Sequence, residues 1–221
     1  MIVIGGMIGA GKTSVAKLLG EELGSQVFFE EVDDNPLLEL FYTANEQEVQ
    51  EKRYPFLLQL TFLSSRFRSI KSALYDKNNV LDRSIYEDWY FTKINNELGR
   101  ISDLEFKIYE ELLDNMMTEL DELPKKAPDL MVYLHGSFEE IIRRIGTRGR
   151  DFEQDDSLMA YYKKLWEGYD EWVDNHYDAS QVLKINIDRY DVVNNPEDAK
   201  EVVELVQKAL ETRDSNVLAN K

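Results

Sequence analysis

Residues 6–13 read Gly-Met-Ile-Gly-Ala-Gly-Lys-Thr and match the phosphate-loop pattern G-x-x-x-x-G-K-[ST] at each fixed position. An apolar run at residues 2–4 precedes this loop, and the apolar spacing of residues 14–23 predicts a helix after it. A glycine-rich turn between a strand and a helix lets successive backbone N–H groups hold a phosphate at the positive end of the helix. A flexible glycine turn is the alternative, but the flanking strand and helix favour nucleotide binding.

The loop assigns a role to each of its residues. Lys12 is expected to reach the outer phosphates of ATP, and the Thr13 hydroxyl is expected to bind Mg²⁺. The predicted ATP-binding residues of this segment are Gly6, Met7, Ile8, Gly9, Ala10, Gly11, Lys12, Thr13 and Ser14. The loop identifies the phosphate donor and says nothing about the acceptor.

The composition restricts the classes of partner. The 221 residues suffice for a single domain, 1–221, with a sizeable core. With 26 basic and 43 acidic residues the net charge is -17, which argues against a nucleic-acid polymer as partner. The absence of cysteine excludes disulfides and thiolate chemistry, and with two histidines it argues against a structural zinc site. Without a leader or an 18-residue apolar stretch, we expect a cytoplasmic protein that does not enter the membrane.

Short apolar runs alternate with helical stretches along the chain. Together with residues 2–4, this pattern predicts an α/β, three-layer αβα fold with a central five-stranded parallel sheet. Ligands of such sheets bind at the carboxyl ends of the strands. The four further strands are expected at residues 27–29, 80–81, 130–134 and 182–187, and the segments around one crevice at residues 6–13, 30–36, 82–88 and 188–191.

Two long helices are predicted, at residues 46–76 and 103–120, each with an apolar stripe. The stripes favour packing inside the monomer, and a dimer face is the alternative. Residues 213–221 form a polar tail that we expect to be frayed.

Acidic residues follow the second and third strands. A carboxylate such as Glu30 can accept a proton from an attacking hydroxyl, but a solvated acidic loop explains residues 30–36 equally well. Asp82 lies where a Mg²⁺ ligand is expected, and Arg83 can neutralise charge on a transferred phosphoryl group. The next residue, Ser84, also begins a helix-capping box with Glu87, and both interpretations can hold.

Four arginines lie within residues 143–150. Arg144 and Arg148 are four residues apart and share a helix face, and Gly149 permits a sharp exit that directs Arg150 elsewhere. A basic helix end is the alternative interpretation. In so acidic a chain the cluster favours a lid of arginines over a phosphoryl group, at about residues 144–156.

These motifs, in this order, resemble the deoxyribonucleoside kinase family, most closely its bacterial deoxyadenosine/deoxyguanosine kinases. The resemblance covers almost the whole chain and implies a P-loop kinase fold with an arginine-rich lid. It rests on Val-Asp-Asp-Asn-Pro at 32–36, Asp-Arg-Ser-Ile-Tyr-Glu-Asp at 82–88, Phe-Lys-Ile-Tyr at 106–109, Arg-Gly-Arg at 148–150 and Glu-Gln at 153–154.

The resemblance implies roles for individual residues. Glu30, rather than Glu31, is similar to the general base that accepts the proton of the sugar 5′-hydroxyl. Asp82 is similar to the residue that helps hold Mg²⁺, and Arg83 to its phosphate-facing neighbour. The remaining implied assignments are Gln59, Arg66 and Asp88 for the base; Arg144, Arg148 and Arg150 for the lid; Glu153 for the 3′-hydroxyl; Val32 for the nucleoside pocket; and Asp191 and Val192, within 189–192, for the donor adenine.

Two positions depart from the family pattern. The tyrosine that holds the sugar in the family is replaced by Glu48, and residues 43–53 form a longer stretch than in close relatives. The sugar is therefore expected to contact Tyr42 or Tyr54, with Tyr42 favoured. The aromatic residue that faces the base is replaced by Thr92, with Phe91 before it, so the preferred base stays open.

The resemblance implies ATP- and Mg²⁺-dependent phosphorylation of a deoxyribonucleoside at its 5′-hydroxyl, with purines favoured and deoxycytidine as a secondary substrate. It also implies a homodimer. The alternatives are a thymidylate-type nucleoside monophosphate kinase and a nucleotide-binding regulator. The serine after Asp82-Arg83 and the carboxylate of Glu153 favour an uncharged acceptor, and the chain has no Asn-Lys-x-Asp guanine-reading motif.

Overall fold

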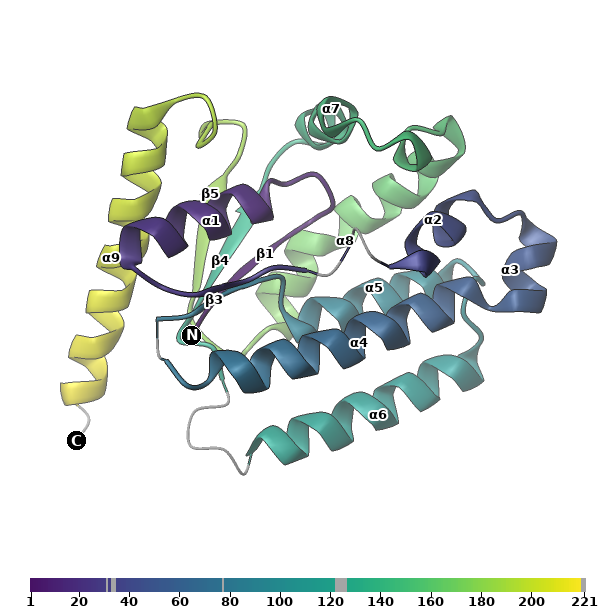
Figure 1. The fold of residues 1–221 in the computed structure, drawn as a ribbon, viewed down its shortest axis with the longest axis horizontal. Coiled ribbons are helices and arrows are strands. Elements are labelled where there is room, and N and C mark those ends of the chain that lie inside the picture. Colours follow the sequence, from purple (N-terminus) through teal and green to yellow (C-terminus); the bar gives the residue numbers. More distant parts are fainter. Residues whose placement is uncertain (31, 33–34, 77, 122–126, 220–221) are drawn as a thin grey trace.

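Five parallel strands form a central sheet in the order β2-β3-β1-β4-β5 (Figure 1). This computed structural model describes residues 1–30, 32, 35–76, 78–121 and 127–219. The five-stranded parallel sheet predicted from the apolar runs is confirmed. The strands are β1 (Ile2–Gly6), β2 (Val27–Phe28), β3 (Val80–Asp82), β4 (Leu130–His135) and β5 (Val182–Asn186).

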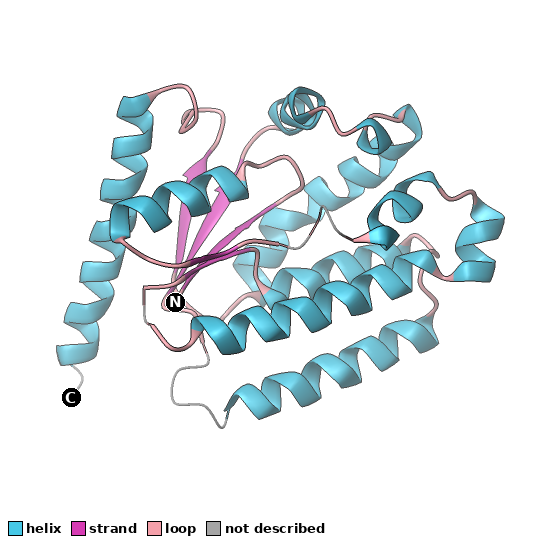
Figure 2. Ribbon diagram, in the orientation of Figure 1, coloured by secondary structure: helices cyan, strands magenta, loops and turns pink. Residues whose placement is uncertain are grey.

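Helices cover both faces of the sheet, which confirms the three-layer arrangement (Figure 2). On one face, α1 (Lys12–Leu23) packs on β1 and β3, and α9 (Pro196–Ala219) packs on β4 and β5. On the other face lie α4 (Tyr54–Ala73), α5 (Ile85–Glu97) and α8 (Met159–His176), where Tyr169 stacks on Tyr133 of β4 with ring centroids 5.7 Å apart. Burial on both faces explains why β1 and β4 are continuous apolar runs.

The predicted helix over residues 46–76 is wrong as a single element. The structure has α3 (Glu46–Lys52) and α4, separated by Arg53 in the left-handed conformation with φ 56°. Pro55 lies in the first turn of α4, where its missing N–H leaves no hydrogen bond unmade. Because a proline inside a helix removes one backbone hydrogen bond and clashes with the preceding turn, Pro55 was the signal for this break.

Three further helices surround the sheet. α2 (Pro36–Thr43) begins at the N-cap Asn35, α6 (Asp103–Asp121) packs on α4 and α5 at the outer side of the molecule, and α7 (Phe138–Arg148) follows β4 (Figure 1). Short 3-10 helices at Asp151–Glu153 and Asp156–Leu158 connect α7 to α8.

The structure also bears on the second long helix, the C-terminal residues and the acidic segment predicted from the sequence. The helix predicted at residues 103–120 is confirmed by α6. At residues 213–219, where a frayed tail was expected, the structure continues α9 through Ala219, and the fraying itself stays a prediction. Residues 220–221 lie outside the described residues, as do Glu31, Asp33 and Asp34 of the acidic segment. Among the described helices, none is long and apolar enough to cross a bilayer.

Candidate active site

A cavity of about 390 Å³ opens at the carboxyl ends of the strands. Its walls come from the loops after β1, β2, β3 and β5 and from α2, α4, α5, α7 and α8. The crevice expected from the strand order is therefore present. The predicted site residues in its lining are Ile8, Gly9, Gly11, Lys12, Thr13, Ser14, Glu30, Val32, Tyr42, Gln59, Asp82, Arg83, Asp88, Arg144, Arg148, Arg150, Glu153 and Asp191.

Three residues of the phosphate loop lie behind the lining and shape the loop. Met7 and Ala10 are buried in the core. Gly6 has φ 143°, and a Cβ there would lie 2.7 Å from the carbonyl oxygen of Leu134. The turn therefore requires glycine at this position. These residues hold the loop in place rather than face the cavity.

Lys12 occupies the start of α1, directly after the N-cap Gly11, which has φ 92°. Its Nζ donates a hydrogen bond to the carbonyl oxygen of Met7 at 2.9 Å, and the side chain is 7 % exposed. Burial, with a smaller contribution from the nearby Arg83, lowers the pKa of Lys12 to about 7. Phosphate oxygens bound beside Lys12 would raise this pKa again and favour the charged ammonium form.

Asp82 and Thr13 come together as predicted for a Mg²⁺ site. The Thr13 hydroxyl donates to Asp82 Oδ2 at 2.6 Å, while among the described residues Asp82 Oδ1 is buried and has no hydrogen-bond partner. Burial raises the pKa of Asp82 above its usual value, against the effect of Lys12. The described residues contain no cluster of three or more His, Asp or Glu around a metal position. One carboxylate and one hydroxyl, completed by phosphate oxygens and water, fit the needs of Mg²⁺.

Glu30 lies between two guanidinium groups at the end of β2. Nη2 of Arg66 donates to Glu30 Oε1 at 2.7 Å, and Nε of Arg83 lies 3.0 Å from the same oxygen. Burial alone would raise the pKa of Glu30, but Arg83 and Arg66 outweigh it and lower the pKa to about 2. The carboxylate therefore stays ionised throughout the physiological range.

Arg83 adopts an unusual backbone conformation for a residue other than glycine, with φ 85°. Its N–H donates to the carbonyl oxygen of Ile4 at 3.0 Å, and its guanidinium lies 4.4 Å from the ring centre of Phe91. Within the described part of the chain, Nε of Arg83 makes no hydrogen bond of good geometry despite its proximity to Glu30. This cation is thus oriented by its backbone and by stacking, with hydrogen-bonding capacity left for an incoming group.

The part of the cavity wall formed by α4 and α5 carries Gln59 and Asp88. Thr92 is fully buried and lies behind them, where its hydroxyl donates to the carbonyl oxygen of Asp88 at 2.7 Å and to Gln59 Oε1 at 3.4 Å. Phe91, not Thr92, faces the cavity. Burial raises the pKa of Asp88 to about 6 and outweighs the opposing effect of Arg66, whose Nε lies 3.2 Å away.

Arg66 differs from the expectation that it reads a base directly. It is absent from the described lining and lies behind the wall with 3 % of its side chain exposed. Its guanidinium contacts Glu30, Asp88 and, at 2.8 Å, the carbonyl oxygen of Asp82. One arginine therefore connects the three segments that carry Glu30, Asp82 and Asp88.

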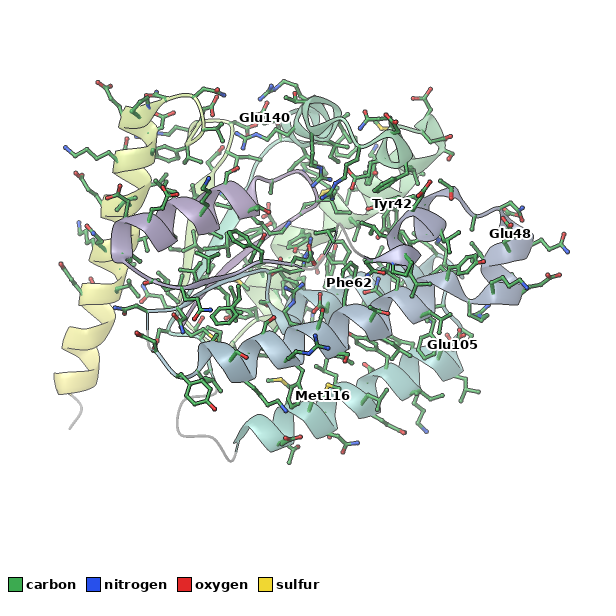
Figure 3. The ribbon with its side chains drawn as sticks, viewed as in Figure 1. Tyr42, Glu48, Phe62, Glu105, Met116 and Glu140 are labelled. Atoms are coloured by element: carbon green, nitrogen blue, oxygen red, sulfur yellow. The ribbon has the colours of Figure 1, made fainter. Side chains whose placement is uncertain are left out.

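Tyr42 rather than Tyr54 lies against the cavity. The Tyr42 ring stacks on Phe152 with centroids 5.6 Å apart and meets Phe41 edge-on at 5.0 Å. Figure 3 labels Tyr42 on α2 together with Phe62 on α4, and both belong to the lining. Tyr54 begins α4 and is absent from the described lining.

The arginines of the predicted lid pair with an acidic side chain. Glu153 is 3 % exposed, accepts a hydrogen bond from Nη2 of Arg148, and lies 3.5 Å from Nη1 of Arg150. Gly149 ends α7 with φ 70°, as predicted for the exit that separates the two arginines. The lid arginines and the predicted 3′-hydroxyl acceptor are therefore already in contact in this structure.

Arg144 connects the lid helix to the phosphate loop. Its guanidinium donates to Glu140 Oε1 at 2.6 Å and to the carbonyl oxygens of Ile187 at 2.8 Å and Ala10 at 3.5 Å. Glu140 is labelled on α7 in Figure 3. Arg144 therefore contacts the backbone of the phosphate loop and of the segment after β5, in addition to Glu140, whereas the hydrogen bond of Arg148 goes to the side chain of Glu153.

The segment after β5 contributes Asp191 as predicted, but Val193 and Asn194 line the cavity in place of Val192, which packs half-buried against the core. Several other lining residues were not predicted, because the sequence does not show which face of each helix turns toward the cavity. These are Leu38, Phe41, Leu58, Phe62, Phe91, Arg143, Thr147 and Tyr161. Val193 could have been found from the sequence, because it is an apolar residue in the polar loop that follows the strand predicted at residues 182–187. An apolar side chain at such a place indicates a contact surface.

The chain is similar to known proteins over nearly its full length. A family model described as deoxynucleoside kinase matches residues 2–211. The deoxyguanosine kinase of Lactobacillus johnsonii is 48% identical, over 92% of this chain and 89% of the relative, and the deoxyadenosine kinase of Lactobacillus acidophilus is 44% identical, over 95% and 96%. A solved structure of deoxyadenosine kinase from M. mycoides with bound dATP has a TM-score of 0.75 and 27% identity, and covers 95% of this chain and 98% of that chain. The similarity spans every element that contributes to the cavity.

Proposed function

Because this chain belongs to the deoxynucleoside kinase family, we propose that it transfers the γ-phosphoryl group of ATP to the 5′-hydroxyl of a deoxyribonucleoside. One observation supports this above the others. Glu30 lines the same cavity as Lys12 and the Thr13–Asp82 pair, so a carboxylate faces the phosphate end of the site from the nucleoside side. That is the arrangement required to join a hydroxyl acceptor to a phosphate donor.

The residues act mainly by positioning and by neutralising charge, because phosphoryl transfer passes through a loose transition state. Lys12 and the lid arginines hold the donor phosphates, and Glu30 accepts the hydrogen bond and then the proton of the 5′-hydroxyl. Thr13 and Asp82 would hold Mg²⁺, which would neutralise charge on the phosphates of ATP. Arg83 lies beside Glu30 and stabilises charge on the transferred group.

The ion pairs of Glu30 determine how basic it is during the reaction. While Arg66 and Arg83 both pair with it, the carboxylate is a weak proton acceptor with a pKa of about 2. An ATP phosphate that attracts Arg83 weakens one of these pairs, which raises the basicity of Glu30 when the donor is in place. Binding of ATP therefore prepares the base.

Purine deoxynucleosides are the substrates that we propose, with deoxycytidine as a weaker one. The support is the naming of two relatives as deoxyguanosine and deoxyadenosine kinases. The chemistry of the pocket agrees, because Asp88 accepts hydrogen bonds from ring or exocyclic N–H groups and Gln59 can both donate and accept. Phe91 offers an aromatic surface beside them.

The function is tested with purified protein, ATP, Mg²⁺ and a panel of deoxyribonucleosides and ribonucleosides, with the products separated by chromatography. We expect deoxyadenosine or deoxyguanosine to give the 5′-monophosphate fastest. Deoxynucleoside monophosphates belong in the same panel, since faster phosphorylation of a monophosphate than of any nucleoside would assign the site to a nucleoside monophosphate kinase instead.

We also propose that the protein is a homodimer that pairs through α6. This helix packs inward through buried Tyr109 but leaves Leu104 (69 % exposed), Ile108 and Leu112 on one outward row. A row of this kind is self-complementary across a two-fold axis. Sedimentation velocity tests the proposal: L104E/I108E is expected to be monomeric and active, whereas Y75E, at the more exposed Tyr75, is expected to remain dimeric. A monomeric wild type would contradict it.

A further inference from the structure

Glu87 is a fully buried carboxylate outside the described lining of the cavity. The capping box predicted from the sequence is present and accounts for one of its oxygens: the N–H of Ser84 donates to Oε2 at 2.9 Å. The other oxygen has partners far away in the chain. Oε1 accepts hydrogen bonds from the N–H of Gly6 at 2.7 Å and from the hydroxyl of Tyr169. The capping box therefore accounts for only one of the two carboxylate oxygens of Glu87.

The two backbone groups that Glu87 binds lie at the two unusual turns of the site. Gly6 has φ 143° at the start of the phosphate loop. Ser84 follows Arg83, whose φ is 85°. Such conformations persist only where the surroundings hold them. Glu87 holds both turns with one carboxylate, and Tyr169 anchors that carboxylate from α8.

We infer that Glu87 is a positioning residue for the phosphoryl transfer. By joining Gly6 to Ser84 it sets the separation between the phosphate loop and the segment Asp82-Arg83. That separation decides whether Thr13 meets Asp82 and whether phosphates on Lys12 meet Arg83. The inference rests on the proposed function, and it deepens it by naming a residue that acts through the groups that touch substrate.

The substitution E87Q tests the inference because it keeps the shape of the side chain and replaces one hydrogen-bond acceptor oxygen by an NH₂ group. Three donors face the side chain: the N–H groups of Gly6 and Ser84 and the hydroxyl of Tyr169. A glutamine amide has one oxygen, so its NH₂ group must face one of the two backbone N–H groups. Either the phosphate loop or the Arg83 segment then loses its attachment.

The chain offers a matched control in Glu48, which forms the same kind of capping box with Asn45 at the start of α3. Figure 3 labels Glu48 on α3, far along the molecule from β1. We expect E87Q to lower kcat by about 10- to 100-fold, because small misplacements of reacting groups have effects of that size. The KM for the deoxynucleoside should change by less than about threefold, and E48Q should keep wild-type kcat. All assays are run well below the melting temperature of each variant.

A second variant, Y169F, removes one donor to Oε1 and leaves the capping box intact. We expect kcat to fall by about 2- to 10-fold, and the double variant E87Q/Y169F to be no slower than E87Q alone, since both changes act on one network. If E87Q does not fold, Y169F decides the question. Wild-type kcat in a folded E87Q, or in Y169F when E87Q is unfolded, overturns the positioning role. Absence of turnover in the wild-type protein would instead overturn the proposed function.

Discussion

Replacing Glu30 by glutamine should affect turnover and stability through the same carboxylate. General-base catalysis contributes about 10²- to 10⁴-fold to a rate, so we expect E30Q to lower kcat by that factor. The dissociation constant of ATP should rise little if at all, because Glu30 contacts Arg66 and Arg83, and its loss leaves Arg83 available to the phosphates. A coupled assay of ADP formation and calorimetry of ATP binding measure the two quantities.

The ion pairs of Glu30 give the size of the stability effect. A pKa lowered from 4.5 to about 2 corresponds to about 3 kcal/mol in favour of the folded state when the carboxylate is charged. Since the pKa is lowered on folding, this stabilisation is complete above pH 4.5 and disappears as the pH falls toward 2. At pH 7, E30Q should therefore lose up to about 3 kcal/mol, or about 6–12 °C in melting temperature for a chain of this size.

Glu105 supplies the control. Hydrogen bonds from Arg53 and Ser102 lower the pKa of Glu105 to about 2 against the effect of burial. Glu105 lies in the first turn of α6 (Figure 3) and is absent from the described lining of the cavity. E105Q should lose stability without losing turnover. Turnover of E30Q within tenfold of the wild type, measured at a temperature where both are folded, would remove Glu30 from the role of base.

Three further predictions follow from the charges of the site. Burial lowers the pKa of Lys12 to about 7, so the ligand-free side chain is neutral above that pH. Calorimetry should therefore show the affinity for ATP falling from pH 6 to 9, with proton uptake on binding, and an affinity that does not depend on pH would contradict this. Burial raises the pKa of Asp88 to about 6, so kcat/KM for the deoxynucleoside should fall as the pH drops through 6, where the carboxyl group becomes neutral, and D88N should lack this limb of the profile. R148A should lower kcat by about 10³- to 10⁵-fold with a smaller change in nucleoside KM, as a lid arginine acts on transition-state charge; steady-state kinetics would refute this if KM alone changed.

The sheet and the crevice could be predicted from the sequence because both depend on burial and on topology. Strands that are buried on both faces appear as continuous apolar runs, and parallel strands bring their carboxyl ends to one edge. These two rules predicted the phosphate loop, the acidic segment at residues 30–36 and Asp82 at one crevice, whereas the choice of Glu30 within that segment came from the family resemblance. The break at Arg53 was missed because a helical pattern continues across it, although Pro55 marked the boundary.

The contacts behind the cavity wall could not be predicted in this way. Arg66 shares a helix face with Gln59, but whether it reaches the cavity or the carboxylates behind it depends on the rotation of α4 and on the depth of β3. The capping box of Glu87 was readable from local spacing, whereas its bond to Gly6 joins residues 81 positions apart. Sequence patterns report local periodicity, and these side chains are placed by tertiary packing.

The pairing of Glu153 with two arginines has a consequence for how the two substrates affect each other's binding. Glu153 now holds Arg148 and Arg150, so a sugar hydroxyl that donates to Glu153 competes directly with these arginines. Each arginine displaced in this way turns its charge toward the donor phosphates. Nucleoside and ATP then strengthen each other's binding, and thermodynamic linkage requires that the factor be the same in both directions. We therefore expect Arg148 and Arg150 to exchange the carboxylate of Glu153 for the phosphates of ATP when both substrates are bound.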